Sequence, residues 1–425
     1  MNYLKQIWQY KDLRSKILLT VGILIIFRLI AHIPISGISE DVIRKFFQKN
    51  AMLGLLDLFS GGALRKFSVA MMGVGPYITA SIIMQLLMMI VPSLEELSKE
   101  GELGQRKINQ YTRYLTVPLA IFEAYGLLML LKNQNLLPVS VFAPFNLLLM
   151  LISATAGTIF LMWLGELISE KGIGNGISII IAVGIISSFP AEIGATFATI
   201  IGGTQWLWVA AMLILTILVI FGIVFVNEAQ RNIPVSYAKR VRGMRMYGGV
   251  STYLPLRVTT AGVIPIIFAI SIMSFPAFII RLFEHARSPW LVSAAKFLSN
   301  ILASTSPIYI ILYFILVVLF TYFYTAVIFN PIKIAENVQK QGGFIPGIRP
   351  GRQTAEFLNL VMNRITLAGA LFLGVIAVLP FLIQSKFPQW QIAIGGTGIL
   401  IIVSVILETM KQLQSLLLTK QYERY

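Results

Sequence analysis

Residues 306–328 read SPIYIILYFILVVLFTYFYTAVI, a run without a charged side chain in which most positions are apolar. A helix needs about 20 predominantly apolar residues to cross the hydrocarbon core of a bilayer. This run is long enough for one crossing, and the bilayer would have no charge to accommodate. It therefore predicts a membrane-spanning helix, and the rest of the chain repeats the pattern.

Ten stretches meet or nearly meet the same criterion. The predicted spans are residues 17–35, 73–92, 114–131, 147–169, 177–190, 206–227, 259–282, 306–328, 366–384 and 391–410, of which the fifth is short and is expected to end at Pro190. The chain is 57% hydrophobic and 12% charged, with a mean hydropathy of +0.80, whereas a soluble domain carries about 25% charged residues. These features predict an all-α polytopic membrane protein and exclude a soluble enzyme on a single anchor.

The 34 Lys and Arg residues predict the orientation of the spans. With the N-terminus inside, most of them fall in inner segments, and cytoplasmic loops are the ones that carry excess positive charge. Both termini are therefore expected in the cytoplasm. Ten spans divide into two sets of five, and an odd number in each set inverts the second half relative to the first. We expect an N-terminal half at residues 1–205 and a C-terminal half at 206–425, with a functional path between them.

Several kinds of chemistry are excluded by composition. The chain has no cysteine, and its two histidines, His32 and His285, are far apart, so no metal site is expected. The stretch ISEKGIGNGIS at 168–178 has neither the preceding strand nor the lysine of a phosphate-binding loop, and it predicts a tight turn between helices. No enzymatic activity and no cofactor are expected.

The predicted spans contain very few ionisable side chains at mid-depth, chiefly Arg28 and Glu123. A proton- or sodium-coupled transporter normally keeps carboxylates in its core. A path lined by Ile, Val, Leu, Met and Gly instead favours a hydrophobic constriction. The alternative of a secondary transporter for a small amphipathic solute stays open at this point.

The two longest cytoplasmic loops are also the most basic. They cover about 229–258, with a predicted turn at Arg242 and Gly243, and about 329–365, which includes GFIPGIRPGRQT at 343–354. Their charge is compatible with a topology signal that also attracts anionic lipid. Their length and their many turn residues favour a docking surface for a large partner that carries acidic groups or RNA.

Residues 55–78 read LLDLFSGGALRKFSVAMMGVGPYI, in which a short apolar run is interrupted by Gly61 and Gly62. The run is too short to span, and non-helical backbone is tolerated at membrane depth only where protein or water shelters it. The segment is either a packed interfacial loop or a short re-entrant helix that closes a pore. In the second case Gly61 and Gly62 supply a hinge, and the apolar cover comes from Leu58, Phe59 and Leu64.

Several segments together resemble the SecY family, the central subunit of the bacterial protein-conducting channel. They are AHIPISG (31–37), GVGPYITASIIMQLL (73–87), SEKGIGNGISIII (169–181), AQRNIPVSYAKR (229–240), LPLRVTTAGVIPIIFA (254–269), NPIKIAENVQKQGGFIPGIRPG (330–351) and GGTGILIIVSVILE (395–408). They occur in family order and cover almost the whole chain.

The resemblance implies ten helices in two pseudosymmetric halves around an hourglass pore that opens across the membrane and sideways into lipid. It places a pore ring at Val74, Ile78, Ile181, Ile185, Ile267 and Ile401, with Val74 where isoleucine is commoner. It places a plug at about 55–66 and a lateral gate in the second, third, seventh and eighth spans, with Phe275 near the pore. It assigns partner docking to Arg240, Arg242, Arg349, Pro350 and Arg352.

A member of this family would pass unfolded secretory polypeptides across the bacterial inner membrane and release transmembrane segments into the bilayer. The resemblance implies SecE, a SecG-like subunit, the motor ATPase SecA and the ribosome as partners, besides membrane lipid. The energy would come from the partner, so the chain itself is expected to bind no nucleotide.

Overall fold

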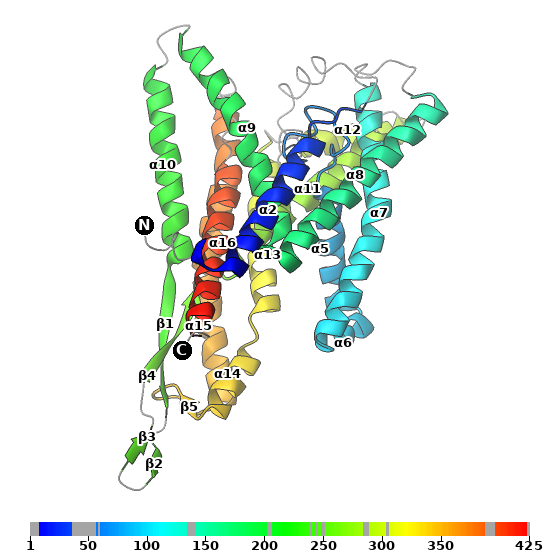
Figure 1. Cartoon of the computed structure of the whole chain (residues 1–425). Helices are drawn as coiled ribbons and strands as arrows, with labels where there is room; N and C mark the ends of the chain where they lie inside the picture. Colours follow the sequence, from blue (N-terminus) through cyan, green and yellow to red (C-terminus); the bar gives the residue numbers. More distant parts are fainter. Residues whose placement is uncertain are drawn as a thin grey trace.

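The computed structural model describes residues 8–35, 57, 60–133, 142–201, 206–237, 240–242, 245–247, 251–283, 289–302, 306–386 and 396–422. The chain is mostly helical, and each predicted span overlaps one of its helices (Figure 1). The helices that contain the spans are α2 (Lys11–Ile30), α5 (Gly75–Ile90), α7 (Glu102–Asn133), α8 (Pro144–Lys171), α9 (Gly176–Ile201), α10 (Trp206–Glu228), α11 (Ile264–Phe283), α13 (Pro307–Ile328), α15 (Arg352–Lys386) and α16 (Gly396–Tyr422).

Three shorter helices connect these elements: α6 (Pro92–Lys99), α12 (Pro289–Ile301) and α14 (Pro331–Lys340). Within the described residues, four helical stretches are by themselves long and apolar enough to cross a membrane: α8, the stretch Pro307–Lys340 that includes α13, most of α15 and most of α16. A fifth crossing is possible through α5 and α6, which are bent by 102° relative to each other. The bend follows from Pro92, because the residue before a proline avoids the helical region and Val91 is extended.

The fifth span does not end where the sequence suggested. Helix α9 continues through Pro190 to Ile201. A proline inside a membrane helix loses one backbone hydrogen bond, but neighbouring helices and local adjustment make this tolerable. The tight turn expected before this helix is present, because α8 ends at Lys171 and the side chain of Asn175 accepts a hydrogen bond of 3.2 Å from the backbone N–H of Ser178.

The sequence did not predict the small sheets outside the helical body. The strands are β1 (Gln230–Tyr237), β2 (Arg240–Arg242), β3 (Arg245–Tyr247), β4 (Ser251–Arg257) and β5 (Gly343–Phe344). One sheet has the antiparallel order β4-β1-β5, and β2 pairs with β3 so that Arg242 lies opposite Arg245. The predicted turn at Arg242 and Gly243 thus falls between two paired strands, and Gly243 itself lies outside the described residues. In Figure 1 the strands and α14 extend below the helices.

Two buried clusters form most of the core. The larger draws residues from α2, α5, α8, α9, α10, α11, α13, α15 and α16. The second joins the segment before α5 to α7 and α8. The beginning of α2 lies beside the end of α16, where Leu13 packs with Leu417 and Lys420 Nζ lies 3.5 Å from Asp12 Oδ2. The outer ends of the first and last helices thus lie on one side of the molecule.

Candidate functional site

The six pore-ring residues, as the sequence assigned them, come from four helices. Val74 caps α5 and Ile78 lies one turn into it, Ile181 and Ile185 lie one turn apart on α9, and Ile267 and Ile401 belong to α11 and α16. All six side chains are buried, with exposed fractions between 0% and 4%. All six belong to the larger buried cluster. The structure therefore brings together residues that are separated by more than 300 positions in the chain.

The helices that carry these residues pack closely in two pairs. Helix α11 packs against α5, and α16 packs against α9. Gly398, close to Ile401 on α16, faces α9 so closely that an added Cβ would lie 3.2 Å from Cγ2 of Ile185. Small residues of this kind let membrane helices approach closely. A constriction lined by branched apolar side chains can seal against ions by dewetting.

The described part of the segment before α5 is made of turns from Gly61 to Phe67, with Asp57 and Ser60 in helical conformation. Leu58 and Phe59, two of the predicted plug residues, lie outside the described residues. Gly61 and Gly62 have φ angles of 65° and 82°, which a side chain would disfavour. The two glycines are therefore needed for a left-handed turn at the point where the sequence predicted a hinge.

A buried carboxylate organises this turn. Asp57 is 3% exposed and its Oδ2 lies 2.6 Å from Nε of Arg65. Its Oδ1 accepts hydrogen bonds from Ser60 Oγ at 3.0 Å and from the backbone N–H of Arg65 at 3.3 Å. The sequence analysis missed Asp57 and Arg65. The signal available was an acidic residue in an apolar run, followed eight positions later by a basic one.

Leu64, which was predicted to cover the ring, does not belong to the cluster that contains the ring residues. Leu64 is buried in the second cluster, with Met71 on its own segment and Leu127 on α7. Its neighbour Ala63, which is 0% exposed, belongs to the cluster that contains the ring. Adjacent residues of the turn therefore point to different cores, a division that depends on backbone angles and not on hydrophobicity.

The two basic loops that were predicted to be cytoplasmic form one folded unit, which we call the docking platform: β1, β4, β5, α14 and the first turns of α15. Strand β1 pairs with β4 from one loop and with β5 from the other. A separate small core fills the unit, built from Ile233, Val235, Leu256, Ile345, Leu358, Val361 and Met362. The loops are thus held in a fixed relation by a sheet and a core, which a topology signal alone would not need.

Arg349 lies on the surface of the docking platform in a firmly held turn. Its carbonyl accepts a 2.9 Å hydrogen bond from Oγ1 of the buried Thr354, and Gly347 and Gly351 have φ angles of 82° and 98°. Arg349 and Pro350 are both exposed, and no acidic side chain of the described chain pairs with Arg349. Arg352, in contrast, has Nε 3.0 Å from Oε1 of Glu356.

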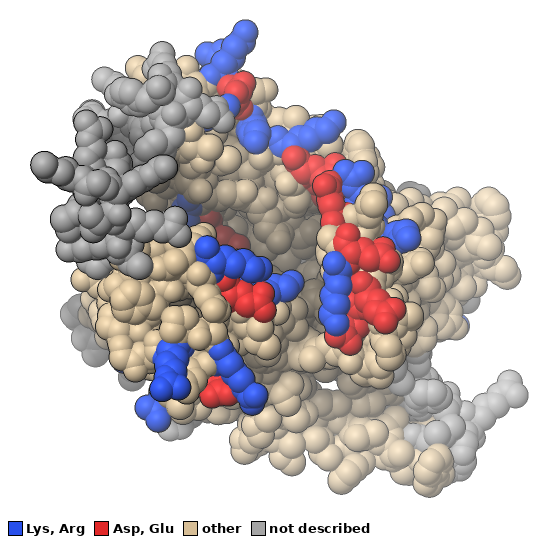
Figure 2. Space-filling model, turned by 90° about the horizontal axis from the view of Figure 1, so that it is seen from below, with Lys and Arg blue, Asp and Glu red and all other residues tan. Residues whose placement is uncertain are grey.

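Arg240 and Arg242 lie on β2, and the described structure extends to their backbone only. Seen from the platform end, charged side chains of both signs surround a hollow in the centre of this face (Figure 2). The described residues include no group of three or more His, Asp or Glu side chains that could hold a metal ion.

Comparison with known proteins identifies the family. The family model for SecY matches residues 68–410, which is more than half of the chain. The chain belongs to the SecY family. Protein translocase subunit SecY of Streptomyces coelicolor is 45% identical over 427 residues, with 97% of each chain covered. The corresponding subunit of Mycobacterium leprae is 45% identical over 434 residues, again with 97% of each chain covered.

Solved structures share the fold of this SecY-family chain. A structure described as a protein conducting channel matches with a TM-score of 0.65 at 20% identity, covering 94% of this chain and 91% of the other. Sec61 in the canine ribosome-channel complex matches with a TM-score of 0.62 at 20% identity, covering the same shares. Another structure, with a TM-score of 0.65 at 21% identity and the same coverage, concerns the plug domain of SecY, which stabilises the closed state of that channel. The expected fold class is confirmed.

In this SecY-family fold, the helices predicted to form the lateral gate are α5, α7, α11 and α13. Helix α11 packs against α5 and α7 on one side and α13 on the other. The ring of Phe268 on α11 makes edge contacts with Phe320 and Tyr324 on α13, at centroid distances of 6.0 and 5.9 Å. Phe275 lies in α11, and its side chain is outside the described part of the chain. The ring contacts therefore join two of the predicted gate helices, α11 and α13.

One buried polar contact lies within the SecY gate region and was not assigned a role from the sequence. Thr79 Oγ1 on α5 donates a 3.4 Å hydrogen bond to Oε1 of Glu123 on α7, and Glu123 is 7% exposed. The carboxylate joins two helices that the family resemblance places on one side of the gate.

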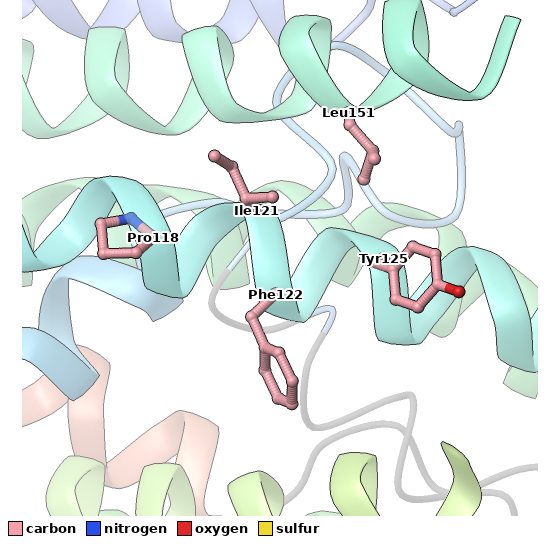
Figure 3. A pocket seen from close by; sticks show the side chains of 5 residues that line it. All are labelled: Pro118, Ile121, Phe122, Tyr125 and Leu151. Carbon is pink, nitrogen blue, oxygen red and sulfur yellow. The ribbon is translucent and has the colours of Figure 1, made fainter. Parts of the chain in front are cut away.

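A shallow apolar groove lies away from the SecY pore ring, on the outer face of α7 and α8 (Figure 3). It is lined by Pro118, Ile121, Phe122, Tyr125 and Leu151. None of these residues belongs to the ring cluster. The groove is therefore separate from the candidate translocation path.

Proposed function

We propose that, in this SecY-family translocase channel, the six pore-ring residues form the constriction through which an unfolded secretory polypeptide passes. The observation that supports this is the burial of all six in one apolar cluster, contributed by four helices. Two of these helices, α5 and α9, belong to residues 1–205, and the other two, α11 and α16, belong to residues 206–425. The constriction then lies between the two halves, where relative movement of the halves widens it.

The segment at about 55–66 serves as the plug in this proposal. Ala63 packs into the ring cluster, and the turn from Gly61 closes over it. Leu64 packs toward α7, and its neighbour Ala63 contributes to the cover. The lateral exit for transmembrane segments lies between the pair α5 and α7 and the pair α11 and α13. In this structure α11 contacts both helices of the other pair.

The docking platform receives the cytosolic partner that drives translocation. Arg349 supports this role because its guanidinium is exposed while its backbone is held by the buried Thr354. A guanidinium suits a carboxylate or an RNA phosphate through paired hydrogen bonds. Arg240 and Arg242 lie on the hairpin at the far end of the platform and extend the basic surface. SecA and the ribosome, as the proposed partners, both offer such groups.

The proposal also covers the membrane in which the protein lies and its partner subunits. The curated relatives are bacterial, and the chain is a multi-pass membrane protein, so the bacterial inner membrane is its proposed site, with SecE and a SecG-like subunit as membrane partners. The outer ends of α2 and α16 lie together, which supports placing both termini in the cytoplasm. Family membership assigns a channel role without enzymatic activity, and no comparison favours the alternative of a small-solute transporter.

Site-specific crosslinking tests the translocation path directly. A photoreactive amino acid at Ile401 should crosslink a stalled secretory chain, because this residue lies in the ring cluster. The same probe at Ile406 on α16, which is 50% exposed, is the matched control and should crosslink lipid or partner instead. Equal capture of the stalled chain at both positions would contradict the proposed path.

A further inference from the structure

The plug segment has a tip, formed by Asp57 and residues 60–65, and a base at residues 67–69. The two parts are attached to the rest of the molecule in different ways. At the base, Ile35 N–H donates to Phe67 O at 2.9 Å and Val69 N–H donates to Ile33 O at 3.0 Å. In the tip, Asp57, Ser60 and Arg65 bond to one another. The tip is joined to helix α2 by a hydrogen bond in which Arg28 Nη1 donates to Gly61 O at 2.8 Å.

Arg28 reaches this carbonyl from the last turn of α2. A helix rises about 1.5 Å per residue, so Arg28 lies roughly 16 Å beyond the start of the predicted span at residue 17, well inside it. The side chain is half-buried, and its guanidinium carbon lies 5.9 Å from the ring centroid of the buried Phe27. A charge at this depth is expensive unless it has a partner, and the plug backbone supplies one.

The plug tip also fits a narrow seat next to Arg28. A Cβ added to Gly61 would lie 2.8 Å from Cα of Gly184 and 2.8 Å from Cζ of Phe27. A Cβ added to Gly184 would overlap Cα of Gly61. Gly184 lies on α9 between the ring residues Ile181 and Ile185. The backbone of the tip therefore touches the ring helix directly, and this contact is possible only with glycine on both sides.

We propose that Arg28 is the latch of the plug: its hydrogen bond to the Gly61 carbonyl holds the tip in the seat formed by Phe27 and Gly184. Arg28 is a positioning residue for translocation, since it acts through the plug and not on the polypeptide. Opening requires the tip to leave this seat while the backbone hydrogen bonds at Phe67 and Val69 keep the base in place. This inference rests on the proposed plug role.

The test uses the absence of cysteine from the chain, so that Ala63→Cys creates the only thiol. Ala63 is 0% exposed in the closed state. In right-side-out membrane vesicles that contain the assembled translocon, a membrane-impermeant maleimide added outside should label this cysteine slowly. Arg28→Met should raise the labelling rate by about tenfold or more, because a hydrogen bond from a charged group is lost. Arg28→Lys replaces the forked guanidinium with a single ammonium group. Its labelling rate should lie between those of the parent and Arg28→Met.

Two further variants complete the comparison. Gly184→Ala should also raise labelling, although Arg28 is intact, because the new methyl group displaces the tip. Arg14→Met removes the same charge from an exposed position on the same helix and should leave labelling unchanged. Should Arg28→Met fail to insert, Arg28→Gln replaces it. Labelling in the Arg28 variants that stays within about twofold of Arg14→Met would overturn the latch, as would an unchanged rate in Gly184→Ala.

Ion conductance measured on the same vesicles separates this inference from the plug role. Faster labelling together with a raised leak supports both. Faster labelling without a leak supports the latch and contradicts the plug as the ion seal. A raised leak without faster labelling overturns the latch and leaves the plug role standing. If Arg28 simply extends to lipid phosphates, Arg28→Lys and Arg28→Met will both label at the parental rate.

Discussion

Asn227 donates a 2.7 Å hydrogen bond from Nδ2 to Oγ of Ser404, which joins the end of α10 to α16 one turn beyond the ring residue Ile401. The Oδ1 atom of the same amide accepts a 2.7 Å hydrogen bond from Oγ1 of Thr259, just before α11. Nζ of Lys411 lies 2.8 Å from Oε1 of Glu228 next to it. The base of the docking platform is thus tied to both helices that carry ring residues in the C-terminal half.

This amide should couple the platform to the ring. Asn227→Ala leaves two buried hydroxyl groups without their partner, so we expect a loss of about 1–3 kcal/mol of stability and weaker motor-driven export. Ser404→Ala should lower the stability less in the Asn227→Ala background than in the parent, because the hydrogen bond between Asn227 and Ser404 is already absent there. Thermal unfolding of the purified translocon measures both effects. Ser415→Ala, at an exposed position on α16, is the control, and strict additivity of the two losses would refute the coupling.

Polar substitution in the pore ring should loosen the seal. Ile401→Asn or Ile267→Asn places an amide among buried branched side chains, where it is costly unless water enters. The constriction should hydrate, ion leak should rise, and export should tolerate defective signal sequences. Ile401→Val, which stays apolar, should behave as the parent. Planar-bilayer conductance and export of a signal-defective substrate are the measurements, and parental values in both Asn variants would contradict the ring assignment.

Deletion of residues 57–64 should raise the resting ion conductance without abolishing translocation. The deletion removes the buried Asp57, the latch carbonyl of Gly61 and the ring contact of Ala63, while the base anchored at Phe67 and Val69 remains. Conductance and export are measured in parallel at equal channel abundance. An ion-tight deletion variant would show that the segment is a packed loop and not a plug.

Substitution of Arg349 should separate partner docking from simple attraction to lipid. Loss of a basic residue near anionic lipid costs about 1 kcal/mol, whereas truncation of one member of a desolvated charged pair costs about 2–5 kcal/mol. We therefore expect Arg349→Glu to nearly abolish ATP-dependent translocation and Arg349→Lys to impair it.

Arg352 supplies the comparison for that experiment. It is paired with Glu356 on its own helix and is largely exposed, so Arg352→Lys should be tolerated. Translocation into vesicles, normalised to channel abundance, is the measurement. If Arg349→Glu exports at the parental rate, the loop at about 329–365 acts as a topology signal and not as a docking site.

The positions of the spanning helices were predictable from sequence because a bilayer imposes a simple requirement on each segment. A run such as 306–328 must be long, apolar and internally hydrogen-bonded, whatever its neighbours are. The structure has a helix at every predicted span. The exception is the end of α9, where Pro190 indicated a boundary and the helix continues to Ile201. The effect of a proline depends on neighbouring helices, which a local pattern does not reveal.

The plug region shows where local patterns fail. Leu64 was expected to cover the ring because it is large and apolar, and it packs toward Leu127 instead. The contact with the ring cluster comes from Ala63, a residue without a distinctive signal. The left-handed turn at Gly61 and Gly62 decides which side chain faces which core. The ring residues themselves were assigned through family resemblance, since any buried isoleucine of these helices has the same local pattern.

The sequence by itself determined the membrane class, the helical spans and the family, because these depend on segment hydrophobicity and on motifs that are read along the chain. Only the tertiary structure decided which residues meet: Arg28 with Gly61, Asn227 with Ser404, and the two cytoplasmic loops in one sheet. Asn227 and Ser404 are 177 positions apart, and the hydrogen bond between them depends on helix packing. Contacts of this kind depend on the direction and distance of two backbones at once, and no single segment encodes either.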